Sequence, residues 1–412
     1  MPSNSVVNII TREILDKGVI PFARFMWLAL YCPVCGYYEK EKDTVGARGD
    51  YYTNVSVGSL FGELLAFQFA EWLQPCVASH IERKMRAGEP DPPKIVEAGA
   101  HNGMLARDIL KWLCEHRPEL FQKLEYWIVE PSPRRQQWQQ ATLAEFAHKA
   151  RWMAALSGPP NSAPVSPDGL SALSISGIIF SNELLDALPA HRLGWDAKAQ
   201  AWFEWGVTLK NGQFVWKRMT CDESGAGIPG AGVRPPGHAQ RTSSPDFEPA
   251  NPWELPPKLL SVLPDGFTIE FCPDAEKWWL AAARALDCGR LLTIDYGLTG
   301  DEFFMPQRHE GTLRAYHRHR LSGDILAQPG EQDITAHVNF SSIQAAGESA
   351  GLQTEAFLAQ AQFLSRIAAR ACGSAASFGS WTSGRKRQFQ TLTHPEHLGR
   401  LFRALVQARN AS

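Results

Sequence analysis

Four short apolar runs in this chain each end at or beside a carboxylate, and these acids are the first candidates for chemistry. Runs of this kind, with helical patterns between them, are typical of buried parallel strands. In an open α/β sheet, ligands bind in the crevice beyond the carboxyl ends of the strands. We therefore expect the acids to converge on one cleft. The runs cover residues 95–97, 127–130, 178–183 and 291–295, and they end at Glu97, Glu130, Glu183 and Asp295.

The turn after the first run is a candidate site for a nucleotide-type cofactor. Gly99 and Gly103 permit a tight strand-to-helix turn and a close approach of the backbone to a ligand. A dinucleotide site would favour G-x-G-x-x-G, with pyrophosphate on the helix N-terminus. Here His101 stands at the second glycine position, and Glu97 is poorly placed for an anionic group. S-adenosylmethionine, which carries a sulfonium and an ammonium and no phosphate, fits better, although two glycines alone also fit an ordinary loop.

Glu130 strengthens the cofactor interpretation because of its place at the end of the second run. A carboxylate at this point of the fold can accept hydrogen bonds from the two ribose hydroxyls of a bound nucleotide. Together with the glycine turn, Glu130 favours a cofactor site over an ordinary loop.

The third run leads into three polar residues that could position an acceptor: Asn182, Glu183 and Asp186. If residues 183–187 form a helical turn, Glu183 and Asp186 share one face. Such a pair could hold a guanidinium through bidentate hydrogen bonds and aim its nitrogen at a methyl donor. An equally good interpretation is a helix N-cap with acids that stabilise the dipole. Asp295 could wall the same cleft or end its strand in an ordinary turn.

The elements that must position these residues fit a large globular chain with more than one domain or with insertions. The chain has 412 residues, 44% hydrophobic and 20% charged, and a net charge of −2, which gives no strong attraction to nucleic acid. Asn211 and Gly212 predict a hairpin turn. We expect an N-terminal segment (1–90), which the resemblance described below makes a helical cap and cofactor-covering segment, and a first core part (91–190). A β-hairpin insertion (191–266) with a flexible loop (222–258) and the core completion (267–412) would follow. We expect a helix pair in 5–31 and helices near 275–286, 341–350 and 397–408.

The eight cysteines include one close pair, Cys32 and Cys35. No second pair stands at zinc-ligand spacing, so we predict no metal and free thiols in a reducing compartment. The N-terminal region lacks a signal-peptide layout, and the apolar stretch 20–30 is too short to span a bilayer and contains Arg24. We expect a cytoplasmic protein that binds no membrane.

These motifs, in this order, resemble those of the MidA-like methyltransferases, a family that includes a mitochondrial complex I assembly factor that methylates an arginine. The resemblance covers roughly residues 8–370, apart from the loops. It is carried by Ala29-Leu30-Tyr31 with Pro33 and Gly36-Tyr37-Tyr38, residues 49–53 with Phe61-Gly62-Glu63, residues 97–108, Glu130-Pro131-Ser132-Pro133, Asn182-Glu183 with Asp186-Ala187-Leu188-Pro189, Asp295-Tyr296-Gly297, and residues 311–316 and 333–338.

The resemblance implies an α/β, Rossmann-like class I methyltransferase fold with a mostly parallel seven-stranded sheet, helices on both faces, an N-terminal helical cap and an inserted β-hairpin region. It implies S-adenosylmethionine as the cofactor and a protein substrate, with a respiratory-complex subunit as one candidate. The segment 49–53 would fold over the cofactor. The implied catalytic residues are Asn182, Glu183 and Asp186, and the implied cofactor-binding residues are Glu97, Gly99, Ala100, His101, Gly103, Glu130, Asp50 and Thr53.

Some positions depart from the family pattern. His101 replaces a glycine, so we expect the turn to avoid a strained φ there, and Val55-Ser56 stand where the family often has Pro-Glu. Leu184-Leu185 replace aromatic residues, and Asn339 replaces an acid. The leading hypothesis is a methyltransferase that acts on a protein arginine. The alternatives are an assembly factor or binding module that keeps the fold without turnover, a nicotinamide-dependent oxidoreductase, and a nucleic-acid methyltransferase.

Overall fold

The computed structural model describes residues 5–40, 53–87, 92–156, 174–219, 257–317, 320–373 and 378–410, without the side chains of 75–87 and 257–258. The chain divides into two compact units, each assembled from three segments. Unit 1 consists of Met1–Glu41, Ala187–Asp274 and Leu298–Ser342, and unit 2 consists of Lys42–Asp186, Ala275–Gly297 and Ile343–Ser412. The four consecutive segments expected from the sequence stay a prediction.

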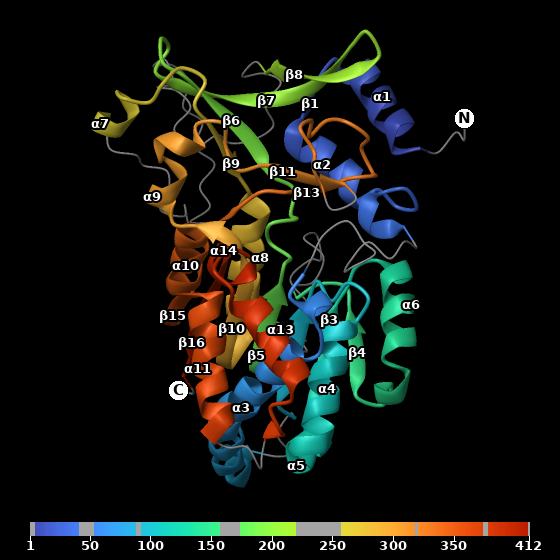
Figure 1. Cartoon of the computed structure of the whole chain (residues 1–412), viewed down its shortest axis with the longest axis vertical. Helices are drawn as coiled ribbons and strands as arrows, with labels where there is room; N and C mark the ends of the chain where they lie inside the picture. The colour runs from blue at the N-terminus through green and yellow to red at the C-terminus, as the bar shows by residue number, and fades with distance from the viewer. Residues whose placement is uncertain are drawn as a thin grey trace. The chain divides into compact units, whose positions relative to one another are not determined.

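Unit 2 is built on the sheet that the sequence predicts. Seven strands run in the order β15-β16-β10-β5-β2-β3-β4 (Figure 1). The five strands from β10 to β4 are mutually parallel, and β16 is antiparallel to both of its neighbours. The mostly parallel seven-stranded sheet is therefore confirmed. Its strands are β2 (Lys94–Ala98), β3 (Glu125–Val129), β4 (Ala150–Met153), β5 (Ile175–Asn182), β10 (Leu286–Leu298), β15 (Gln353–Ala359) and β16 (Phe402–Arg409).

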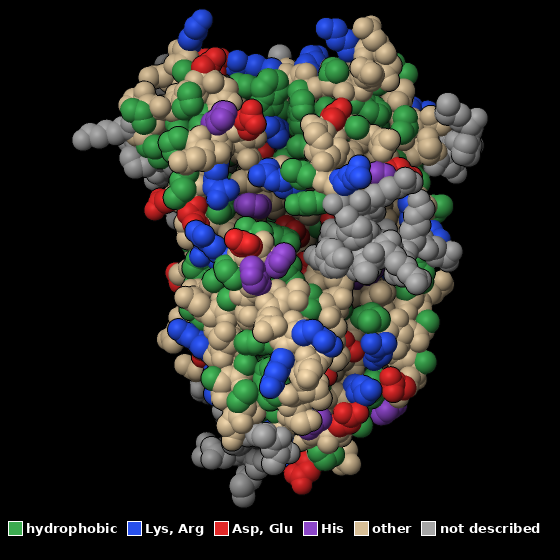
Figure 2. Space-filling view, in the orientation of Figure 1, with side chains coloured by type: hydrophobic (Ala, Val, Ile, Leu, Met, Phe, Trp, Pro, Cys, Tyr) green, Lys and Arg blue, Asp and Glu red, His purple; other side chains and the backbone are tan. Residues whose placement is uncertain are grey.

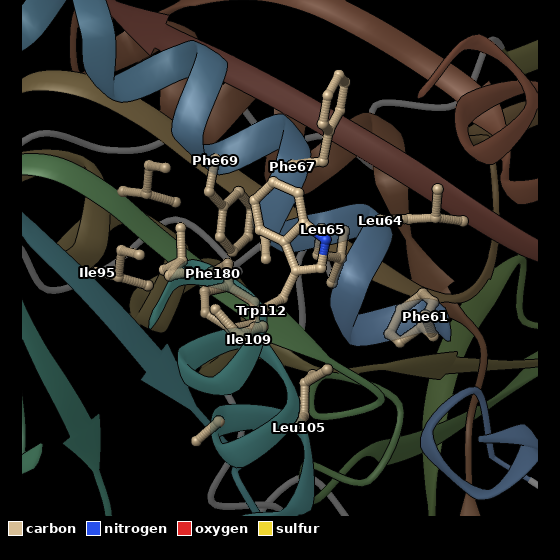
Figure 3. Packing of buried hydrophobic residues seen from close by; sticks show 14 of the residues in the cluster. Phe61, Leu64, Leu65, Phe67, Phe69, Ile95, Leu105, Ile109, Trp112 and Phe180 are labelled. Atoms are coloured by element: carbon tan, nitrogen blue, oxygen red, sulfur yellow. The ribbon is translucent and has the colours of Figure 1, made fainter. Parts of the chain in front are cut away.

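Helices cover both faces of this sheet. Alternate strand residues such as Ile95, Ile178 and Phe180 pack into one cluster with α3, α4 and α11 (Figure 3). On the other face, Gln407 of β16 accepts a hydrogen bond from Trp279 of α8 and donates one to the backbone of α10. The helices are α3 (Leu60–Ala87), α4 (Met104–His116), α5 (Pro118–Lys123), α6 (Pro133–Thr142), α8 (Pro273–Ala285), α10 (Phe340–Ser349), α11 (Gln360–Gly373), α13 (Ser383–Thr393) and α14 (Leu398–Leu401), with 3₁₀ turns η2 (Val55–Val57) and η3 (Ala144–Phe146).

The expected last helix over 397–408 is wrong. Only α14 is helical there, and β16 follows it as an interior strand between β10 and β15. Phe402, Leu405 and Val406 recur at helical spacing, but these residues and Gln407 are buried on both faces of the sheet. A strand buried on both faces loses the alternation that would identify it in the sequence.

Unit 1 carries the predicted helix pair and hairpin. α1 (Val6–Lys17) and α2 (Phe22–Tyr31) flank β1 (Ile20–Pro21), and β7 (Ala201–Lys210) turns into β8 (Gln213–Arg218) through Asn211 and Gly212, both with positive φ. The larger sheet runs β1-β7-β6-β9 with β8 beside β7, and a small one runs β12-β11-β13. The other elements are η1 (Tyr37–Glu39), β6 (His191–Asp196), α7 (Pro257–Leu260), β9 (Thr268–Phe271), α9 (Gly300–Phe303), η4 (Pro306–Arg308), β11 (Arg314–His317), β12 (Arg320–Leu321), β13 (Asp333–Thr335) and β14 (Val338–Asn339).

The surface fits the balanced composition of the chain. On the face shown in Figure 2, basic and acidic side chains are interspersed with apolar and neutral polar ones. In the part of the chain that the structure describes, no helix has the length and apolar character needed to cross a membrane. The expected flexible loop 222–258 lies outside the described residues, except for the backbone of its last two positions.

Candidate functional site at the strand ends of unit 2

The glycine turn joins β2 to α4 in the way that the sequence predicts. Gly99 has φ +77° and Gly103 has φ +84°, both in the left-handed region that favours glycine. The Gly103 N–H donates to the Ala100 carbonyl at 2.7 Å and closes the turn. A Cβ at Gly99 would lie 3.0 Å from Leu184, which follows β5. The turn therefore needs glycine at Gly99 both for its backbone and for its close approach to the next loop.

The expectation that His101 avoids a strained φ is wrong. Its φ is +46°, inside the left-handed region. A non-glycine residue can adopt this conformation at a cost of roughly 1–2 kcal/mol when its surroundings fix it. Here the His101 carbonyl accepts a hydrogen bond from Gln139 at 3.0 Å, and the Asn102 side chain accepts the Met104 N–H at 3.2 Å. The turn is thus held from both sides and begins α4 without a middle glycine.

Glu130 lies directly after β3 and is almost fully buried, with 2% of its surface exposed. Its Oε1 accepts hydrogen bonds from the Ser132 N–H at 2.9 Å and from Arg135 at 2.8 and 3.0 Å. Its Oε2 accepts one from Gln139 at 3.1 Å. Because a carboxylate oxygen has two lone pairs, Oε2 is the oxygen with room for a ribose hydroxyl. Arg135 could not be recognised as a partner from the sequence, because helix α6 had to be placed first.

Glu97 lies on the face of β2 that packs beneath α3 and α4, and its carboxylate accepts a 2.7 Å hydrogen bond from the Tyr126 hydroxyl. Burial raises the pKa of Glu97 to about 7, and the bond from Tyr126 acts in the opposite direction. Burial, and then the charge of Glu97, raise the pKa of Tyr126 well above its ordinary value. The structure thus gives Glu97 a core partner, and its contact with a cofactor stays a prediction.

The segment after β5 is a tight bend, so the conditional helical turn over 183–187 is wrong. Glu183 has φ +52°, which a right-handed helix cannot contain. The Glu183 N–H donates to the Ile294 carbonyl at 3.0 Å. The N–H groups of Leu184 and Leu185 donate to the Asp295 carboxylate at 3.1 and 2.8 Å. Hydrogen bonds to the Asp295 carboxylate, rather than those of a helix, therefore shape this bend. Glu183 and Asp186 do not share a helical face.

Asp295 and Asp186 form a pair of neighbouring carboxyl groups. Asp295 is fully buried, and burial raises its pKa to about 7, against the hydrogen bonds from Leu185, Tyr296 and Asp186. One of those bonds joins the two side chains. A hydrogen bond between two carboxyl groups requires a proton, since two carboxylates in contact cannot both ionise. Asp186 therefore has a structural partner in addition to its predicted catalytic role.

The structure adds two residues that sequence reasoning missed, Asn54 and Gln360, both fully buried. The Asn54 side chain donates to Asn182 Oδ1 at 3.1 Å, and its backbone N–H donates to Glu183 Oε1 at 2.9 Å. Gln360, the first residue of α11, donates to Asn54 Oδ1 at 2.7 Å. Asn182 also donates to Glu183 Oε1 at 3.1 Å. The chain positions of these residues differ by up to 306, so no local spacing could have linked them.

Of the segment 49–53, which is expected to fold over the cofactor, the structure describes only Thr53. Thr53 is buried just before the short η2 turn, where its N–H donates to the Ser56 hydroxyl and its hydroxyl accepts the Ser56 N–H. Thr53 therefore reaches the site through its neighbour Asn54. The predicted cofactor contact at Asp50 lies outside the described residues.

Comparison with known proteins agrees with this arrangement. Residues 76–358, more than half of the chain, match the family described as "Putative S-adenosyl-L-methionine-dependent methyltransferase". The chain is 28% identical over 362 residues to the mitochondrial protein arginine methyltransferase NDUFAF7 homolog of Drosophila melanogaster, with 84% of this chain and 71% of that protein covered. Identity to human NDUFAF7 is 26%, with 82% and 69% covered.

A solved structure extends the agreement to the fold. The crystal structure of a protein from Burkholderia thailandensis bound to S-adenosyl-homocysteine superposes with a TM-score of 0.72 at 26% identity, over 99% of this chain and 92% of that one. The expected fold and the expected cofactor, S-adenosylmethionine, are therefore confirmed. Because the family model matches more than half of the residues, this chain belongs to the S-adenosyl-L-methionine-dependent methyltransferase family that the resemblance indicated.

Proposed function

We propose that this methyltransferase transfers the methyl group to an arginine side chain of a protein substrate. The relatives from Drosophila melanogaster and human are named protein arginine methyltransferases, which supports a protein acceptor and an arginine within it. S-adenosylmethionine supplies an electrophilic methyl group on its sulfonium. The chain's own task is then to bind and orient the acceptor nitrogen, because methyl transfer depends on in-line positioning.

The observation that carries the proposal is the way Glu183 is held. Two donors, the Asn54 N–H and the Asn182 side chain, bind the same oxygen, Oε1, and fix the plane of the carboxylate at the end of β5. A carboxylate held in this way suits an N–H of the planar guanidinium, which would form a charge-assisted hydrogen bond with it. Asp295 fixes the following bend, so the position of Glu183 is set from both directions.

The residues that would hold the cofactor are those of the turn 99–103 and Glu130. They fit the group, since Oε2 of Glu130 has room for a ribose hydroxyl and Gln139 joins this carboxylate to the His101 carbonyl of the turn. Glu183 would bind a guanidinium nitrogen that does not react and would keep the reacting nitrogen in line with the methyl group that the cofactor would supply.

A labelled-methyl experiment tests the proposal. The purified protein is incubated with cell lysate and S-adenosylmethionine that carries a labelled methyl group, and the protein fraction is hydrolysed and its amino acids separated. We expect label in methylarginine with the wild type and strongly reduced label with Asp186→Asn, whereas the cofactor affinity of that variant is unchanged. Label in methyllysine would overturn the choice of acceptor, and wild-type turnover of Asp186→Asn would leave Asp186 with its structural role alone.

A second candidate, a binding module that keeps the fold without turnover, is favoured by the carboxyl pair. Asp186 is already bonded to the buried Asp295, so the motif could serve only to shape the bend. Both candidates bind S-adenosylmethionine, and product formation separates them. Titration with NADH in parallel tests the oxidoreductase alternative.

We also propose a cytoplasmic location, which cell fractionation tests, although the relatives cited above are named mitochondrial.

A further inference from the structure

Cys32 and Cys35 belong to a tight turn that follows α2 in unit 1, and the methyltransferase site does not use them. Their Sγ atoms are 3.0 Å apart, with Cys32 buried and Cys35 half-buried. The N–H groups of Cys35 and Gly36 both donate to the Cys32 carbonyl, at 3.2 and 2.7 Å. The backbone therefore folds back on itself and brings the two thiols into contact.

The turn is fixed by unusual backbone features. Val34, between the two cysteines, has φ +75°, which is rare for a β-branched residue and marks a constrained turn. Gly36 is required because a Cβ there would lie 2.6 Å from the Cys32 nitrogen and from the Leu30 carbonyl oxygen. The backbone at Val34 and Gly36 therefore keeps the two sulfur atoms close together.

This geometry does not suit a zinc ion. With Zn–S bonds of about 2.3 Å and tetrahedral angles, two thiolates on one zinc lie about 3.8 Å apart. Among the described residues, no group of three or more His, Cys, Asp or Glu side chains could hold a metal ion. A disulfide instead needs a sulfur–sulfur bond of about 2.0 Å, which the pair reaches by closing about 1 Å.

We propose that Cys32 and Cys35 form a reversible dithiol–disulfide site that small-molecule disulfides of the glutathione type oxidise. The site is independent of the proposed methyl transfer and goes beyond the free thiols expected from the sequence. The cysteine pair lies next to a hydrogen bond that joins two distant parts of the chain. Tyr31 directly precedes Cys32, and its hydroxyl donates at 3.0 Å to the carbonyl of Ala187, the residue after Asp186. Closing the disulfide would stiffen the turn next to this bond.

The exchange balances without any other reactant. The more exposed Cys35 thiolate attacks one sulfur of oxidised glutathione, forms a mixed disulfide and expels a glutathione thiolate. Burial raises the pKa of the Cys32 thiol to about 12, so Cys32 is the resolving residue rather than the first nucleophile. It loses its proton to a glutathione thiolate, attacks the Cys35 sulfur and expels the second glutathione. Two protein thiols are oxidised, and one glutathione disulfide is reduced to two thiols.

The sequence makes the product easy to detect. Trypsin cleaves after Arg24 and Lys40, and the peptide 25–40 between them contains these two cysteines and no others. The full chain is incubated with oxidised glutathione, the remaining thiols are alkylated, and the peptide is analysed by mass spectrometry. We expect the peptide to lose two hydrogens and take up no alkyl group, and to return to the doubly alkylated form when a reducing thiol is added first.

Matched variants separate the two cysteines. In Cys32→Ser, Cys35 should stop at the mixed disulfide with glutathione, whereas in Cys35→Ser the buried Cys32 should react much more slowly. The exposed Cys114 and Cys372, changed to serine together, serve as the control and should leave disulfide formation in peptide 25–40 unchanged. Double alkylation of wild-type peptide 25–40 under conditions that glutathionylate Cys114 and Cys372 would overturn the proposal.

Discussion

At the scale of single residues, Glu130 gives the sharpest test of the cofactor site. Glu130→Gln keeps the shape of the side chain but removes the charge that accepts from Arg135 and that is predicted to accept from a ribose hydroxyl. We expect S-adenosylmethionine affinity to fall by ~1.5–3 kcal/mol, the range for hydrogen bonds to charged groups. Calorimetric titration measures the change. Glu125→Gln, at the opposite end of β3, is the matched control and should bind normally. Unchanged affinity in Glu130→Gln would remove Glu130 from the ribose role.

Glu97 gives a second prediction at this scale, on stability and pH. The folded-state pKa of Glu97 is raised to about 7, above the value that an unfolded chain would have. Between about pH 4.5 and pH 7 the folded protein therefore holds a proton that the unfolded chain releases, and the free energy of unfolding falls as the pH rises through this window. A shift of this size corresponds to ~3 kcal/mol.

Glu97→Gln should remove that dependence. Relative to the wild type, the variant should gain stability from pH 5 to about pH 7 and level off above it, because the neutral amide is never ionised. Urea denaturation of both proteins at several pH values measures this difference. Parallel profiles would show that Glu97 keeps an ordinary pKa and that water reaches its carboxylate.

Single residues also show what the sequence could place. Gly99, Gly103, Glu130 and Asn182 lie at strand ends as predicted, because the apolar run before each of them identifies the strand, and their roles stay predictions. Asn54 could not be found, because its role depends on partners 128 residues away in β5 and 306 residues away in α11. His101 was misjudged because the sequence shows the missing glycine but not the hydrogen bond from Gln139 that holds the left-handed turn.

At the scale of elements, β16 shows why part of the fold escaped prediction. Its residues look like one face of a helix, and only its pairing with β10 and β15 makes it a strand. Non-local pairing of this kind determines the secondary structure of a short apolar segment more strongly than local propensity does. The strands β2, β3, β5 and β10 were predictable because each ends at a polar motif with its own spacing.

Gln407 provides the test of how β16 is locked into the sheet. This fully buried side chain accepts from Trp279 at 2.7 Å and donates to the Gln344 carbonyl and the Thr354 hydroxyl at 2.9 and 3.0 Å. It joins α8, α10, β15 and β16. Gln407→Met keeps the volume but leaves several buried polar groups without partners, so we expect a loss of ~2–4 kcal/mol in the free energy of unfolding.

Chemical denaturation measures that loss. Gln353→Met, at an exposed position on the neighbouring strand β15, is the control and should change stability by less than ~0.5 kcal/mol. Equal effects of the two substitutions would mean that the hydrogen bonds of Gln407 add no net stability to the sheet.

At the scale of the whole molecule, the predicted site residues are distributed unequally between the two units. Every predicted cofactor and catalytic residue that the structure describes lies in unit 2, whereas the cysteine turn and the hairpin β7–β8 lie in unit 1. A ligand that binds only the folded form stabilises it by RT ln(1 + [L]/Kd), about 2.7 kcal/mol at a hundred times Kd. That stabilisation should act on the unit that makes the contacts.

Hydrogen exchange followed by mass spectrometry can show where S-adenosylmethionine acts. We expect slower exchange in unit 2, strongest for the turn 99–104 and the segment that follows Glu130, and unchanged exchange in the strands β7 and β8 of unit 1. The segment 183–186 should also slow, because Leu184 packs against Gly99 in the cofactor turn. Equal slowing of β7 and β8 would show that the two units open as one cooperative body. No slowing at 99–104, with binding verified by calorimetry, would place the cofactor away from the glycine turn.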